Sequence, residues 1–104
     1  MRTYNYKSQG WWVLRDILAN GEAFTNSTKN FRGEPGKAVY SGRLSGYWQE
    51  KLSADYYRMT YVVWSYGTPI AWQLDGKNWV EVSETFSQTT FQHQSKLSVA
   101  IAEQ

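Results

Sequence analysis

The sequence predicts an α+β domain, a two-layer fold in which two helices cover one face of a curved antiparallel sheet of about five strands. Three observations predict it. Apolar residues recur at helical spacing near both ends of the chain, the segment between them alternates as strands do, and turn-forming residues separate the strands. At 104 residues the chain has the length of one domain, so we expect residues 1–104 to share a single core.

The first helix is expected near the N-terminus, where apolar residues recur every three to four positions from Trp11 to Leu18. Ser8 can cap this helix, although Gly10 weakens the first turn and favours a start at Trp11. Asn20-Gly21 is expected to end it.

Residues 22–46 have a looser pattern, dense in turn formers. Two short strands are expected there, at Ala23-Phe24 and at residues 38–40, joined by an exposed polar loop. Residues 47–56 can form one or two helical turns, but no strong cap defines them.

An antiparallel meander is expected from Tyr57 onward. Its first strand is rich in β-branched and aromatic residues, as central strands are. A corner at Gly67-Thr68-Pro69 leads into a strand at residues 70–74, and the Asp75-Gly76 turn leads into a strand at residues 79–82. The two faces of the first strand are expected to hold Thr60, Val62 and Trp64, and Met59, Tyr61 and Val63.

The pattern returns to helical spacing near the C-terminus. Thr89 or Thr90 can cap a helix that runs to about Glu103. Its free N–H groups could also bind an anion, but capping is the favoured reading. The inner face of this helix is expected to carry His93, Leu97, Ala100 and Ile101.

Composition excludes several classes of site. The chain has no cysteine, which rules out disulfides, thiolate metal sites and cysteine nucleophiles, and its single histidine rules out a multi-histidine metal centre. We therefore expect no metal and no cofactor. The longest apolar run is four residues, so no export signal or membrane span is expected.

Three stretches carry a resemblance to a known family: "AFTNSTKNFRGE", "YVVWSYGTPIAW" and "FSQTTFQHQSKL". Together they resemble small uncharacterised proteins encoded mainly by bacteriophages of actinobacteria, mycobacteriophages included, over most of residues 23–96. The resemblance implies the cytoplasm of an infected bacterium as the setting, and it brings no established activity. We interpret the motif residues as structural: Ser65, Gly67, Thr68, Pro69, Thr89, Thr90, His93 and Gln94.

Catalysis is the less favoured interpretation of these motifs. Ser65 and His93, with Asp75 or Asp55, supply the residue types of a hydroxyl, a base and an orienting group. However, no Gly-x-Ser-x-Gly elbow surrounds Ser65. We expect His93 to pack inside the domain with its ring nitrogens bonded to Thr89, a backbone carbonyl or a tyrosine hydroxyl. A small hydrolase using His93 is kept as the second alternative to a non-enzymatic protein.

Binding through aromatic side chains is the favoured function. The chain has six Trp, eight Tyr and four Phe, more than one small core needs. We expect a phage accessory protein that binds a bacterial host protein, with at least three exposed rings in one patch, and the same surplus could equally build a homodimer. The candidate partner-binding residues are Trp12, Trp48, Trp64, Tyr66 and Trp72.

Nucleic-acid binding is the first alternative. Basic and aromatic residues interleave between residues 29 and 51, where five Lys and Arg side chains outnumber two Glu. No recognised nucleic-acid module is present, so a solvated face is the favoured reading. The candidate phosphate-binding residues are Lys29, Arg32, Lys37 and Arg43.

Overall fold

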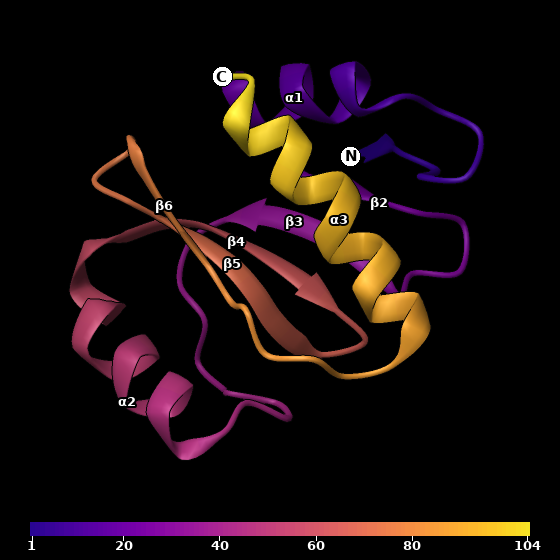
Figure 1. Ribbon diagram of the computed structural model, residues 1–104. Helices are drawn as coiled ribbons and strands as arrows, with labels where there is room; N and C mark the ends of the chain where they lie inside the picture. Colours follow the sequence, from indigo (N-terminus) through magenta and orange to yellow (C-terminus); the bar gives the residue numbers. More distant parts are fainter.

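The computed structural model describes all 104 residues and has an α+β fold with one open six-stranded sheet and three helices (Figure 1). Strands follow one another across the sheet in chain order, and every pair is antiparallel except β1–β2. The elements are β1 (Arg2–Thr3), α1 (Trp11–Ala19), β2 (Phe24–Thr25), β3 (Phe31–Pro35), α2 (Gly46–Asp55), the 3-10 turn η1 (Tyr56–Arg58), β4 (Met59–Ser65), β5 (Thr68–Leu74), β6 (Asn78–Glu81) and α3 (Gln88–Ala102).

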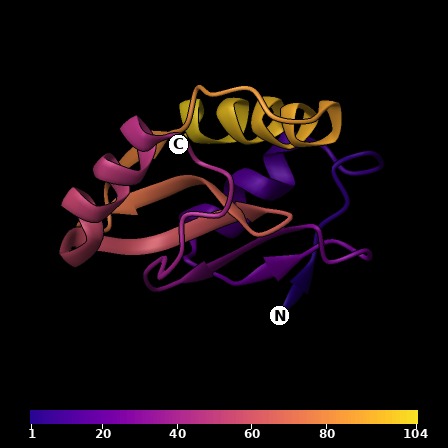
Figure 2. The ribbon, with the colours of Figure 1, turned by 90° about the horizontal axis from the view of Figure 1, so that it is seen from below.

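The structure confirms a sheet packed with helices, but it has six strands and three helices instead of about five strands and two helices. The sheet is mixed and has six strands, because the short β1 pairs in parallel with β2. Helices α1 and α3 pack together on one side of β4 and β5, while α2 lies on the other side (Figure 1). The view from below shows α2 at one end of the molecule and the N-terminus toward the other (Figure 2). The predicted two-layer arrangement is therefore wrong, since α2 adds a third layer.

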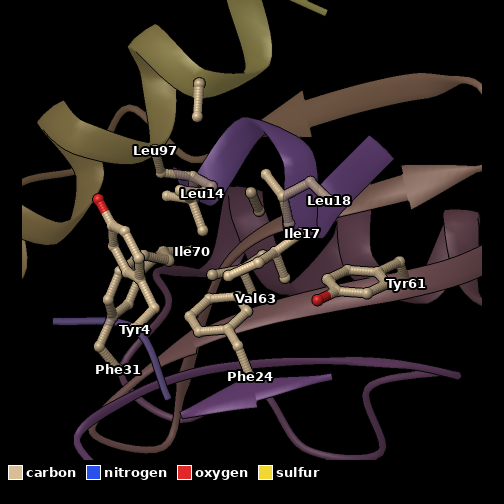
Figure 3. Packing of buried hydrophobic residues seen from close by; sticks show 12 residues of the cluster. Tyr4, Leu14, Ile17, Leu18, Phe24, Phe31, Tyr61, Val63, Ile70 and Leu97 are labelled. Carbon is tan, nitrogen blue, oxygen red and sulfur yellow. The ribbon is translucent and has the colours of Figure 1, made fainter. Parts of the chain in front are cut away.

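Two apolar clusters occupy the two faces of the sheet. The larger contains residues of α1 and α3 over the rings of Tyr4, Phe24, Phe31 and Tyr61 (Figure 3). The smaller lies beneath α2 and is built around Trp64 and Trp72. Because both faces of β4 are covered, six of its seven residues are buried, which confirms the predicted central strand.

The N-terminal strands differ from the prediction. Phe24 begins β2 as expected, but its antiparallel partner is β3, and residues 38–40 form no strand. Gly33 explains the pairing, because a Cβ there would lie only 2.4 Å from the Phe24 ring and 2.8 Å from the Tyr61 hydroxyl. Two buried rings therefore fix β3 in place, while residues 38–40 run over the sheet as a loop.

An irregularity in the β4–β5 pairing changes which face of β4 Met59 occupies. The register shifts between Met59 and Tyr61, and again between Val63 and Trp64. Consequently Met59 joins the cluster under α2 with Val62 and Trp64, rather than sharing the face of Tyr61 and Val63 as predicted.

The cap of α3 also lies elsewhere than predicted. Ser87, not Thr89 or Thr90, is the N-cap, and its hydroxyl accepts a hydrogen bond of 3.1 Å from the Thr90 backbone N–H. We expect Ser87→Ala to lower the free energy of unfolding by about 1 kcal/mol. Urea titrations of the two proteins measure the change, with Thr89→Ala as the control. An equal loss in both variants would contradict the assignment of the cap.

Candidate functional site

The β4–β5 corner is a two-residue turn at Tyr66 and Gly67. The two flanking residues, Ser65 and Thr68, pair across the strands, and the turn residues have φ values of 59° and 126°. Gly67 has a positive φ that glycine readily adopts, but Tyr66 occupies a left-handed position that usually takes Gly or Asn. Pro69 already lies within β5, where β6 does not reach it, because β5–β6 pairing involves residues 71–74.

A chain of hydroxyl groups leads from the start of α3 to His93. Ser87 Oγ donates to Thr90 Oγ1 at 3.1 Å, Thr90 Oγ1 lies 2.9 Å from Ser65 Oγ, and Ser65 Oγ lies 2.7 Å from His93 Nδ1. These three hydroxyl groups and Nδ1 form one continuous hydrogen-bonded chain. The corner motif and the helix motif thus touch each other directly.

Aromatic rings enclose the imidazole. His93 stacks on Phe31 with ring centroids 4.4 Å apart, and Tyr6 and Tyr66 lie 4.7 and 6.3 Å away. Burial lowers the pKa of His93 to about 4, so the ring is neutral at pH 7. The expected packing of His93 is present, but the partner of Nδ1 is Ser65, and Nε2 has no hydrogen-bond partner within the chain.

Neither candidate aspartate completes a triad with Ser65 and His93. Asp55 accepts the Trp72 indole N–H at 2.9 Å and pairs with Lys51 at 3.0 Å on the α2 side of the sheet. Asp75 pairs with Arg58, which lowers the pKa of this carboxyl group. No carboxylate orients the imidazole, and both Ser65 and His93 are buried, so the pair is suited to holding α3 on the sheet.

The eighteen aromatic side chains divide evenly between buried, half-buried and exposed positions. Among the candidates, Trp12 and Tyr66 are exposed and Trp48 is half-buried, but Trp64 and Trp72 are buried and contribute no exposed surface. The exposed rings lie on several elements of the fold, and two of them, Tyr40 and Tyr57, line one groove. The exposed rings are Trp12, Tyr40, Tyr47, Tyr57, Tyr66 and Phe91.

Exposed apolar side chains border a groove beside α2. The groove has a volume of about 640 Å³ and lies between the loop after β3 and the end of α2. Tyr57 and Tyr40, 88% and 62% exposed, lie on it. Sequence reasoning missed this groove because residues 38–40 were assigned to a strand. Its lining residues are Ala38, Val39, Tyr40, Ser41, Gln49, Leu52, Ser53, Tyr56 and Tyr57.

The four candidate phosphate-binding residues differ in the ion pairs and hydrogen bonds that their side chains form. The Lys37 ammonium donates to the backbone carbonyls of Tyr56, Tyr57 and Met59, which uses all three of its protons. Arg32 pairs with Glu34 at 2.9 Å and lies over the Trp64 ring. Only Lys29 and Arg43 have side chains without an ion pair or hydrogen bond.

Comparison with known families identifies the chain. A family of unknown function, DUF8033, matches residues 12–102. The chain belongs to this family. The match spans α1 to α3, so it includes both the corner and the His93 cluster. No curated protein and no solved structure matches the chain. None of the three helices has the length and apolar character that crossing a membrane requires.

Proposed function

We propose that this DUF8033 protein is a non-enzymatic binding protein whose groove beside α2 takes up an extended segment of another protein. The observation that supports the proposal is the exposure of Tyr57, Tyr40 and Val39 on the walls of that groove, at 88%, 62% and 70%. Large rings held in the open are typical anchors of protein interfaces, because they bury much area at little conformational cost.

The chemistry of the groove favours a peptide over a nucleic acid. Its lining contains no lysine, arginine or carboxylate, and the nearby Lys37 ammonium is occupied by backbone carbonyls. Hydroxyl and amide groups at Ser41, Ser53 and Gln49 suit the backbone of a peptide.

The partner that we propose is a protein of the bacterial host, which is the setting that the resemblance to phage proteins implies. The loop after β3 forms one wall of the groove and the end of α2 the other. A second copy of this chain and a nucleic acid are the two other occupants that the experiment distinguishes.

Affinity purification from an actinobacterial lysate tests the proposal when the tagged protein is compared with Tyr40→Ser/Tyr57→Ser. Phe91→Ser/Trp12→Ser serves as the matched control, because it removes two exposed rings elsewhere. We expect a host protein that binds the wild type and the control, and whose dissociation constant for the purified groove variant rises at least about tenfold, as loss of interface anchors causes.

Three results would overturn the proposal. The first is retention of the same partner by the groove variant. The second is self-association, seen as a concentration-dependent mass in sedimentation that the groove variant abolishes. The third is capture of nucleic acid whose affinity falls steeply between two salt concentrations and depends on Lys29 and Arg43.

A further inference from the structure

Two adjoining hollows lie on the opposite side of the sheet from the α2 groove, and they share Tyr6 and Lys7. Their volumes are about 370 and 350 Å³, each near the lower end of the range for small-molecule pockets. The walls come from the loop before α1, the loop between β2 and β3, the β4–β5 turn and the N-terminal half of α3. Four segments distant in sequence therefore build one surface.

Charge on this surface has a single sign. Lys7 and Lys96 line the hollows, neither forms an ion pair, and no aspartate or glutamate lines either one. The hollow along the other edge of α3 differs, since Glu81 and Glu84 line it. Two unpaired ammonium groups without a carboxylate between them favour an anion.

Polar groups without partners in the chain accompany these lysines. The hollow of about 350 Å³, here called the inner hollow, is lined by the hydroxyls of Ser27, Thr28 and Thr89. These hydroxyls make no hydrogen bond within the chain. Thr89 also stands in the first turn of the 15-residue α3, where backbone N–H groups point away from the helix. Hydroxyl and N–H donors beside lysines are the groups that phosphate oxygens accept from.

Two exposed rings border the hollows, and one of them is held at a conformational cost. Tyr66 and Phe91 are each 57% exposed. The φ of 59° at Tyr66 costs roughly 1 kcal/mol or more in a residue other than Gly or Asn. Because the turn itself would be better formed by Asn, the ring of Tyr66 is retained for something other than turn formation.

We propose that the paired hollows bind a nucleotide, with its phosphate on Lys7, Lys96 and the free hydroxyls and its base stacked on Tyr66 or Phe91. The lysines and the hydrogen-bond donors suit a phosphate group, because no carboxylate lines the hollows. The flanking rings suit the base, since base–aromatic stacking is favourable and tolerant of sequence. Inorganic phosphate would use only the first set of groups. This site is separate from the α2 groove, so either can fail without the other.

Two-dimensional NMR titration of the ¹⁵N-labelled protein tests the proposal with adenosine and uridine monophosphates, the matching nucleosides, inorganic phosphate and a short single-stranded oligonucleotide. We expect saturable shifts of the amide signals of residues 5–7, 27–30, 66 and 89–96. The monophosphates should bind at least about tenfold more tightly than nucleosides or phosphate, because each lacks one set of contacts.

Variants separate binding from folding. Lys7→Gln/Lys96→Gln should weaken nucleotide binding about tenfold or more, whereas Lys77→Gln, which removes a charge at the distant β5–β6 turn, should not. Tyr66→Asn should weaken nucleotide binding while leaving the midpoint of thermal unfolding unchanged or higher, because Asn tolerates the left-handed turn. A merely structural Tyr66 would give the opposite pair of results.

The proposal is overturned if the amide shifts fall outside these segments, if nucleoside, phosphate and nucleotide bind equally, or if Lys77→Gln weakens binding as much as the double variant. Tight binding of the oligonucleotide with no binding of monophosphates would also overturn it, and would indicate that this surface binds single-stranded nucleic acid instead. Because none of these readouts involves Tyr40 or Tyr57, a negative result here leaves the α2 groove unaffected.

Discussion

Replacement of Trp72 by alanine is expected to lower the free energy of unfolding by about 3–5 kcal/mol, the usual cost of deleting a buried aromatic side chain. Trp72 is 0% exposed, lies beneath α2 and packs against the edge of Trp48 at a centroid distance of 6.2 Å. Its indole N–H also donates to Asp55, which is itself buried. The variant therefore leaves both a cavity and a carboxylate that keeps only Lys51 as a partner.

Urea unfolding followed by circular dichroism measures this effect, with Trp12→Ala as the matched control. Trp12 is 54% exposed, so the same change of residue type should cost no more than about 1 kcal/mol there. Trp72→Phe separates the two contributions, since it keeps a ring but removes the N–H donor, for an expected loss of about 1–3 kcal/mol. Equal losses at residues 72 and 12 would contradict the described burial of the smaller cluster.

Local pattern was sufficient to predict the meander from β4 to β6. Alternation in β4 and the turn at Asp75-Gly76 depend on residues close in sequence, and the structure gives Asp75 and Gly76 φ values of 57° and 70°, as such a turn requires. The irregularity near Met59 was not predictable, because it reflects how β4 meets β5 and leaves no mark in the alternation of either strand.

Helix α2 was predicted only as one or two helical turns, and strand β3 was not predicted. Only Leu52 and Asp55 of α2 are buried, so its ten residues carry little apolar periodicity to define the full helix. For β3, the deciding feature is the space at Gly33 for two rings from other strands, a tertiary feature that the turn-rich composition around it conceals. Long-range packing therefore overrode the local signal at β3.

The candidate site also combines local motifs that the sequence identified with a long-range contact that it did not predict. The sequence singled out the "SYGTP" and "TTFQHQ" stretches separately, but it contained no signal that Ser65 would meet His93, 28 residues later. Their direct contact gives both stretches a structural role without invoking catalysis: each supplies one side of the joint between the β4–β5 corner and α3. The hollow over this joint depends on Tyr66 pointing outward, which only the left-handed turn geometry reveals.

His93 is expected to make the stability of the domain depend on pH between about 4 and 6.5. Burial lowers its pKa to about 4 in the folded protein, whereas an unfolded chain has a value near 6.5. Between these values the unfolded chain binds a proton that the folded protein does not bind, so acid favours unfolding. The stability that the neutral, buried His93 contributes to the free energy of unfolding is fully present above pH 6.5. It is lost as the pH falls towards 4, by up to about 2 kcal/mol between pH 7 and pH 5.

Urea titrations at pH 7, 6 and 5 measure this slope in the wild type and in His93→Gln, which cannot titrate. The variant is expected to be less stable at every pH, because it loses the stack on Phe31, but to lose much less stability between pH 7 and pH 5. Ser65→Ala is the control that removes the hydrogen bond to Nδ1 while keeping the titrating ring. Equal slopes in wild type and His93→Gln would contradict the prediction.

A direct measurement is independent of whether the variants fold. His93 is the only histidine, so its imidazole carbon-bound protons give one resolved set of NMR signals whose titration reports its pKa. A folded-state value near 4 supports the closed joint between the corner and α3, in which no carboxylate stabilises the imidazolium. A value near 6.5 would mean that water reaches the ring and that the joint is open.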